Sequence, residues 1–479
     1  MLLRIALAAL GLLLGCLSNG VVAQEMGGTE IAAPLDDDGD EVDTIHARAV
    51  TTARMLGLDK VAIPPPVPGE RTLLFPLRAK PNSPSMSPYA ISGFSDRNAA
   101  AGQIQDFACG TRTYDGHQGV DLYLHPFPWF QMDQGETEIV AAAAGTIVEK
   151  RDGEFDRQCA WGTNQLANYV AIRHDDGLYA YYLHMKRGTV TTLAIGSRIA
   201  AGDYLGLVGS SGRSSSPHLH FEMRTADGFQ GTVVEPFAGA CGAAGTAWKH
   251  QWPAQLDTSL TMLATSNAAP ERGRTCSPTI NDNPHYSNVF QPGGRVYAIV
   301  ALRDQRPADQ TLVEVRRPDG SLLASTTTNT TNEPFSNSYW WYRYFDLPSN
   351  APAGVWKVRA TLGTQILEHA FFVGASPATT QLFGAIAPTG RSVQVPFTAT
   401  MFATILNAGA QPAHGCSIGL DTPTDVAFAY QTTDPATNQL TGTRNTAVTL
   451  PADTPPTLRF PLTPPGRARG AMPRDHLTE

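Results

Sequence analysis

The chain has 479 residues, of which 35 are Lys or Arg and 43 are Asp or Glu, for a formal net charge of −8. This length exceeds what one ordinary hydrophobic core supports, so we expect about two to four domains. The sequence contains no Lys/Arg-rich block that could follow a phosphate backbone, which argues against nucleic acid as a partner.

Residues 1–23 have the layout of a secretory signal peptide. A single basic residue, Arg4, precedes a short apolar run, and small residues end at Ala23. The run is too short to predict a transmembrane helix, so we expect a protein that is secreted, periplasmic or held in the cell envelope. The sequence LLGC, which ends at Cys16, also resembles a bacterial lipobox. A lipid anchor on Cys16 is therefore an alternative to soluble export.

The other five cysteines would be free to form disulfides in an oxidising compartment. Pairs Cys109 with Cys159 and Cys241 with Cys276 would each close a local loop, although spacing alone does not determine connectivity. An odd number leaves one cysteine over. None of them belongs to a CxxC pair, which favours structural roles.

Residues 24–70 are acidic and rich in Ala and Pro, with PLDDDGDEVD followed by AIPPPVPGE. This composition predicts a disordered N-terminal segment and a stiff linker. Its length and acidity also raise the hypothesis that the segment is a removable block on activity.

Short strand-like runs separated by Gly, Asp and Ser turns extend over residues 71–240 and predict a mainly β domain. Residues 241–280 are expected to form a connector. The runs and turn signals of residues 281–375 predict an immunoglobulin-like β-sandwich, and residues 376–465 predict a second β-rich domain. Residues 466–479 complete the chain as an expected disordered tail.

An aromatic cluster stands in the expected sandwich, at Trp340, Trp341, Tyr342 and Tyr344. Such a cluster can stack on carbohydrate, but aromatic side chains in strands usually lie in the core. Both interpretations are kept as hypotheses.

Histidines and a carboxylate recur in two motifs of residues 71–240. In SSPHLHFEMR, the alternation of a strand places His218 and His220 on one face. In DGHQGVDLYLH, His117 and Asp121 are separated by three residues. Two imidazoles and a carboxylate leave the fourth tetrahedral position of zinc for water. An iron oxygenase would place its carboxylate two positions after the first histidine, so the spacing argues against that alternative.

A third motif, GLYAYYLHMKRG, lies between these two and ends its strand-like run at His184. The motifs HQGVD, YYLHM and HLHFE, in this order over residues 115–222, resemble the signature motifs of the lysostaphin-type zinc endopeptidases. The resemblance implies a small antiparallel β-sheet of the duplicated hybrid motif type, with an open groove above it. It also implies peptide cross-links of bacterial peptidoglycan as substrate.

The resemblance implies a role for five residues. His117, Asp121 and His220 would hold one Zn²⁺ per chain, and His184 and His218 would be the catalytic histidines. Beside the metal, His218 would take a proton from the attacking water. His184 would donate to the developing oxyanion or protonate the leaving nitrogen, and the sequence leaves open which histidine takes which role.

The loop LYLHPFPWFQMDQGET is longer and more aromatic than the family pattern. Its side chains Phe127, Trp129 and Phe130 either form a wall of the substrate groove or cover the edge of the sheet. His125 in the same loop and Asn168, which opens the run NYVAIRH, are further candidates for substrate binding.

Two functional classes follow. The first is a monomeric, exported zinc endopeptidase whose C-terminal β domains bind the wall or act as spacers. The alternative is a catalytically silent or autoinhibited cell-wall-binding protein of the same fold. The sequence does not distinguish a Gly-Gly bond from a D-Ala-diaminopimelate bond or a protein linkage.

Overall fold

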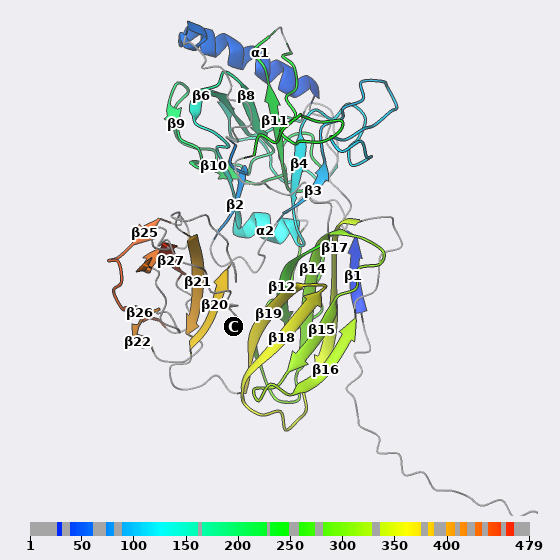
Figure 1. Ribbon diagram of the computed structural model, residues 1–479, viewed down its shortest axis with the longest axis vertical. Helices are drawn as coiled ribbons and strands as arrows, with labels where there is room; N and C mark the ends of the chain where they lie inside the picture. Colours follow the sequence, from blue (N-terminus) through cyan, green and yellow to red (C-terminus); the bar gives the residue numbers. More distant parts are fainter. Residues whose placement is uncertain are drawn as a thin grey trace, which may run out of the picture.

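The computed structural model describes most of the chain (Figure 1). The described residues are 26–30, 39–60, 73–80, 89–160, 165–227, 230–248, 258–273, 281–327, 336–374, 382–387, 399–407, 412–418, 427–433, 439–451 and 457–463. The expected signal peptide, the lipobox cysteine and the C-terminal tail lie outside them. Among the residues described, no helix has both the length and the apolarity needed to cross a bilayer.

Two antiparallel sheets build the region that carries the three motifs. The larger sheet has the order β3-β4-β11-β8-β7-β6-β9 and the smaller one β10-β5-β2. The larger contains β3 (Tyr89–Gly93), β4 (Val120–Leu124), β6 (Gly145–Arg151), β7 (Tyr169–His174), β8 (Tyr179–Leu183), β9 (Arg198–Ile199) and β11 (His218–Arg224). The smaller contains β2 (Leu77–Ala79), β5 (Thr137–Val140) and β10 (Tyr204–Leu207), and a short helix α2 (Pro128–Gln134) precedes β5.

The alternation of β11 separates the core from a polar face. Leu219 and Phe221 point into a hydrophobic core that also contains Ile139 of β5 and Leu205 of β10. The intervening residues of β11 project to the opposite side of the seven-stranded sheet. We call this side the histidine face, and on β11 it carries His218, His220, Glu222 and Arg224.

Two further sheets pack on each other as a β-sandwich. One has the order β1-β17-β14-β12 and the other β13-β19-β18-β15-β16. The first contains β1 (Met26–Glu30), β12 (Ser259–Ser266), β14 (Arg295–Gln305) and β17 (Ser336–Asp346). The second contains β13 (Val289–Phe290), β15 (Leu312–Arg316), β16 (Leu322–Thr327), β18 (Gly354–Leu362) and β19 (Gln365–Val373). The strand β12 lies in the expected connector, which is therefore partly sandwich.

Buried aromatic residues fill the sandwich and its contact with the motif-bearing region. Trp341 and Trp356 lie in the core between the two sheets. Trp340 points the other way and meets Phe127 with ring centroids 4.9 Å apart. The two tryptophans of β17 are at most 3% exposed, so the aromatic cluster is mainly core and interface, not a carbohydrate platform.

A third group of short strands follows the sandwich, as the mainly β prediction requires. These strands are β20 (Leu382–Ala387), β21 (Ala399–Asn407), β22 (Ala413–Cys416), β23 (Ala427–Phe428), β24 (Gln431–Thr433), β25 (Leu440–Thr441), β26 (Val448–Leu450) and β27 (Thr457–Thr463). All of their pairings are antiparallel. The prediction of a mainly β, antiparallel fold is confirmed.

The prediction of disorder across residues 24–70 is wrong in two places. β1 pairs with β17 at the edge of the sandwich. The segment Gly39–Met55 forms a 17-residue helix, α1, followed by a 3₁₀ turn, η1 (Leu58–Lys60). Apolar residues recur along α1 at helical spacing, but they are mainly Val and Ala among acidic residues. The overall composition of the segment concealed this period.

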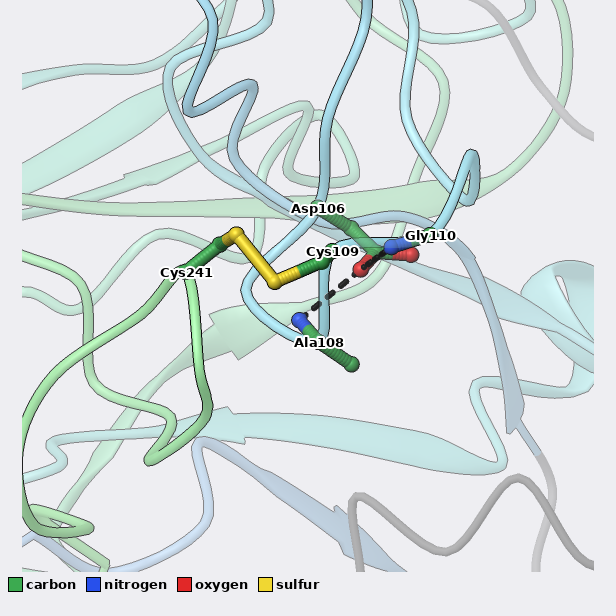
Figure 2. The surroundings of a disulfide bond; sticks show 5 residues. All are labelled: Asp106, Ala108, Cys109, Gly110 and Cys241. Carbon is green, nitrogen blue, oxygen red and sulfur yellow. Dashed lines mark hydrogen bonds between the residues drawn. A yellow bond between two sulfur atoms is a disulfide. The ribbon is translucent and has the colours of Figure 1, made fainter.

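The expected disulfide pairs are also wrong. Cys109 bonds to Cys241, which is 132 residues away in the chain (Figure 2). Cys159 is also disulfide-bonded, whereas Cys416 is free. The Asp106 carboxylate shapes the loop at Cys109, because its Oδ1 accepts the backbone N–H groups of Ala108 and Gly110, each at 2.8 Å (Figure 2). The disulfide ties this loop, which leads into the first motif, to the segment that follows β11.

Replacing Cys109 and Cys241 together by serine should lower the free energy of unfolding by about 2–5 kcal/mol, because the disulfide constrains a long loop in the unfolded chain. Urea titration of the oxidised protein measures this. Cys416→Ser is the matched control and should change the free energy by less than about 1 kcal/mol, since Cys416 is not cross-linked. Equal effects of the two changes would contradict the assigned pairing.

Trp340→Ala should lower the free energy of unfolding by about 3–5 kcal/mol, because it opens a cavity against Phe127. Ile366→Ala, on an exposed position of β19 that is 44% accessible, is the control and should cost less than about 1 kcal/mol. If the two variants unfold at the same urea concentration, the interface is not a stabilising contact.

Candidate metal centre

Three side chains from the first and third motifs converge in the structure. Asp121 Oδ1 lies 3.2 Å from His117 Nε2 and 3.1 Å from His220 Nδ1. The two ring nitrogens are 3.4 Å apart. Ligands of a tetrahedral zinc ion at bond lengths near 2.0–2.1 Å are separated by about 3.3 Å. The donor set therefore fits zinc, with three protein ligands and one position left open.

Strand pairing brings these residues together. β4 and β11 are antiparallel neighbours, and Asp121 lies directly opposite His220. His117 approaches from the turn that precedes β4. Gly119 sits between them, where a Cβ atom would lie 2.5 Å from His220 Nε2. A larger residue at position 119 would displace the imidazole, so the glycine is needed for close approach.

Hydrogen bonds orient each candidate ligand. His117 Nδ1 donates to the Phe94 carbonyl at 2.8 Å, which leaves Nε2 as the lone-pair nitrogen. His220 Nε2 donates to Glu222 Oε2 at 3.2 Å, which leaves Nδ1 for the metal. Such outer partners fix the tautomer and the ring orientation of metal-binding histidines.

Tyr114 is a residue near the site that the sequence patterns did not indicate. Its hydroxyl donates to Asp121 Oδ2 at 2.8 Å, and its ring stacks on His117 with centroids 4.2 Å apart. Tyr114 therefore holds both the carboxylate and an imidazole. It precedes the first motif in a loop, where no periodicity could have identified it.

His184 and His218 stand beside the donor set as a pair. Their ring centroids are 4.2 Å apart, and His218 Nε2 lies 3.9 Å from Asp121 Oδ1. His184 follows β8 with a φ of 64°, in the left-handed region, which turns the chain out of the strand. Its Nδ1 donates to the Ser211 carbonyl at 2.6 Å, and His218 Nδ1 donates to the Ser216 carbonyl at 2.7 Å. With Nδ1 engaged in these bonds, Nε2 is the nitrogen that each ring has left for other contacts.

An ionic chain continues from His220 along β11. Glu222 accepts from His220 and from Arg224 Nε, and Arg224 Nη1 also donates to Asp43 of α1 at 2.5 Å. Burial alone would raise the pKa of Glu222, but the His220 hydrogen bond and the Arg224 charge hold it below its ordinary value. The two-residue period of HLHFEMR already places Glu222 and Arg224 on the face of His220, so this signal was available in the sequence.

The three residues expected to bind substrate are buried and have partners inside the protein. His125 is fully buried and its nitrogens hydrogen-bond to Thr261 and Ser338 of the sandwich. Burial lowers its pKa to about 3, so the ring is neutral. Trp129 is 2% exposed and packs in the core below the histidine face. The aromatic loop thus covers an edge and joins two domains.

Asn168 is also a structural residue. Its Oδ1 accepts the Glu154 backbone N–H at 2.9 Å, and its Nδ2 donates to the carbonyls of Glu154 and Met185, each at 3.1 Å. With every amide group engaged and the side chain buried, Asn168 holds two loops together. Sequence position alone could not distinguish this role from substrate contact.

Comparison with known proteins agrees with this geometry. The family model described as Peptidase family M23 matches residues 116–236. The peptidoglycan DD-endopeptidase ShyC of Vibrio cholerae is 35% identical over 101 residues, which are 21% of this chain and 22% of that protein. Lysostaphin of Staphylococcus staphylolyticus is 26% identical over 203 residues, or 38% of each chain.

One solved structure also matches about a third of this chain. It is a mutant of the catalytic domain of the prophage-encoded M23 protein EnpA from Enterococcus faecalis, with 26% identity, a TM-score of 0.20, and coverage of 31% of this chain and 88% of that one. The chain spans less than two-fifths of the length of the two curated relatives above. Residues 116–236 therefore form a domain that matches Peptidase family M23, and the chain resembles the lysostaphin-type peptidases of that family.

Proposed function

We propose that this protein is an exported, zinc-dependent endopeptidase that hydrolyses peptide cross-links of bacterial peptidoglycan. The observation that carries the proposal is the convergence of His117, Asp121 and His220 at the spacing of a tetrahedral metal site. The His184 and His218 pair beside this site supplies proton acceptors where hydrolysis needs them.

His117 Nε2, Asp121 Oδ1 and His220 Nδ1 would hold the zinc ion. When bound, zinc lowers the pKa of a coordinated water and polarises the carbonyl to be attacked. His218, whose Nε2 is 3.9 Å from Asp121 Oδ1, would take the proton from the attacking water.

His184 completes the chemistry from the adjacent strand end. Once protonated on Nε2, it can donate to the developing oxyanion or pass its proton to the leaving nitrogen. Its Nδ1 hydrogen bond to Ser211 fixes the ring for either step. The proton that His218 takes from the water would pass to His184, whose ring centroid is 4.2 Å away, and from there to the leaving nitrogen.

The relatives support the choice of substrate. One is named a peptidoglycan DD-endopeptidase and another is lysostaphin. The expected signal peptide would deliver the chain to the compartment that holds such a substrate. The β-sandwich and the third group of strands would then bind the wall or space the catalytic domain.

A catalytically silent or autoinhibited protein of the same fold is the second candidate. It is favoured by one observation, namely that α1 packs on residues of the histidine face. The first experiment is therefore digestion of purified peptidoglycan by the zinc-loaded protein, with fragments identified by mass spectrometry. Intact peptidoglycan with zinc bound would favour the second candidate.

His218→Ala should lower kcat/KM for peptide release by about 10²–10⁴-fold while one zinc per chain is retained, because it removes the proton acceptor. Fragment release and metal content are measured on the same preparation. His285→Asn, which removes an imidazole outside the M23 domain, is the control and should retain activity. Equal activities of the two variants would exclude His218 as the proton acceptor.

Glu222→Gln should weaken zinc binding by about 10–100-fold, because the charged acceptor that orients His220 is lost. Competition with a chromogenic chelator measures the affinity without any turnover. Glu149→Gln on β6 is the matched control, since Glu149 bonds to Tyr169 and not to a candidate ligand. An unchanged zinc affinity in Glu222→Gln would show that Glu222 does not position the ligand.

A further inference from the structure

The helix α1 lies on the histidine face. β8 pairs with β11 so that Leu183 is opposite His220 and Tyr181 is opposite Glu222. Opposed residues of an antiparallel pair project to the same side, so Leu183 and Tyr181 share the histidine face. Both pack against α1 in one apolar cluster, and Figure 1 shows α1 lying across the sheet that contains β6, β8 and β11.

An apolar stripe holds the helix in place. Val42, Ile45, Ala49 and Ala53 recur every three or four residues and are at most 1% exposed. The sheet residues in the same cluster are Val148, Ala167, Tyr169, Ala171, Tyr179, Tyr181 and Leu183. The helix is therefore docked by continuous apolar burial along its length.

Carboxylates in the first turns of α1 engage cations of the domain. Asp43 Oδ1 accepts from Arg224 Nη1 at 2.5 Å. Glu41 Oε1 accepts from Arg151 Nη1 and from the Ala167 backbone N–H, each at 3.1 Å. The composition of this segment predicted a solvated linker, but these two carboxylates bind specific groups of the domain.

The same contacts reach the metal centre. Arg224, held by Asp43, also bonds to Glu222, which in turn accepts from His220. In the docked state the five functional side chains of the centre are at most 4% exposed. The candidate ligand His220 lies on the same face of the sheet as the residues that α1 packs against.

We propose that α1 is an intramolecular blocking segment, which occupies the part of the histidine face where a peptide substrate binds and must leave before cleavage. This inference rests on the proposed function. It assigns the earlier hypothesis of a removable block to one helix and to named contacts.

Both ends of the segment are tethered. Before α1, β1 pairs with β17 of the sandwich. After it, Leu73 forms a bridge with Trp248. A released helix would remain near its docking site at high effective concentration. Blocking is therefore reversible and depends on how strongly α1 docks.

His46 adds a pH dependence to the docking. It is fully buried on the docked side of α1, with Nδ1 bonded to the Tyr181 hydroxyl and its ring edge against Tyr179. The charged groups around it are Arg224, Glu222, Asp43 and Asp227. Burial lowers its pKa from 6.5 to about 4. A neutral His46 therefore favours docking above pH 6.5, and this contribution is lost as the pH falls toward 4.

The test uses the full zinc-loaded chain and the double variant Glu41→Arg/Asp43→Arg, which opposes two cations to Arg151 and Arg224. We expect peptidoglycan cleavage to rise by about ten-fold or more, because the open fraction increases. Hydrogen exchange should show lost protection in α1 and retained protection in β8 and β11. Thr51→Arg, on the exposed side of α1, is the matched control and should behave as the wild type.

A folded double variant whose α1 has lost protection, but which cleaves no faster than the control, would overturn the inference. If no form cleaves peptidoglycan although zinc is bound, the proposed function fails by itself. The inference is then decided by the rate at which a chelator extracts zinc. Extraction about ten-fold faster in the double variant supports blocking, and an equal rate in all forms refutes it.

A second arm compares zinc extraction at pH 7.5 and pH 5, values that lie on either side of the ordinary His46 pKa of 6.5. The rate of zinc extraction should increase from pH 7.5 to pH 5, and this increase should be larger in the wild type than in His46→Leu. The leucine keeps the apolar contact but has no titrating ring. The difference between the two proteins isolates His46 from protonation of the ligands themselves. An identical pH response of both would remove His46 from the mechanism.

Discussion

The antiparallel pairing of β4 with β11 is the constraint on which the rest of the structure depends. It sets Asp121 opposite His220, and the alternation of β11 then sends Leu219 and Phe221 into the core. A shift of one residue would move the histidines into the apolar core and the leucine onto the histidine face. The hydrophobic core thus holds the candidate ligands in register, although none of its side chains belongs to the donor set.

The polar side chains buried on the histidine face must form hydrogen bonds or ion pairs with one another. An unpaired charge in this environment would be strongly destabilising. Glu222 meets this requirement from both sides, because it accepts from His220 and from Arg224. Tyr114 and the Phe94 carbonyl do the same for Asp121 and His117. The network that neutralises the buried charges is therefore also the one that orients the ligands.

Parts of the chain far from the motifs complete the surroundings of the M23 domain. β1 joins the sandwich, α1 packs on the histidine face, and the Cys109–Cys241 disulfide ties the loop before the first motif to the segment after β11. His125 and Phe127, which lie just after the first motif, face the sandwich. The sandwich and the helix thus pack on different residues of the same domain.

The sequence by itself determined what depends on local periodicity and spacing. The HLH triplet in a strand and the three residues between His117 and Asp121 predicted a three-ligand metal site. The resemblance of the three motifs to the lysostaphin-type endopeptidases then implied its members and the antiparallel sheet. Strand alternation is a local property, so it survives folding unchanged. The two-residue alternation of the same strand, continued from His220, would also have placed Glu222 and Arg224 on this face.

Only the tertiary structure decided which distant segments meet. The composition of residues 24–70 indicated disorder, yet α1 forms because its small apolar stripe finds a complementary sheet face. The cysteines pair across 132 residues because the fold brings their loops together, which no spacing rule encodes. His125 and Asn168 were expected to bind substrate because polar residues near a site look alike in a sequence. Their burial and their partners come from contacts with loops and a sandwich that lie far away along the chain.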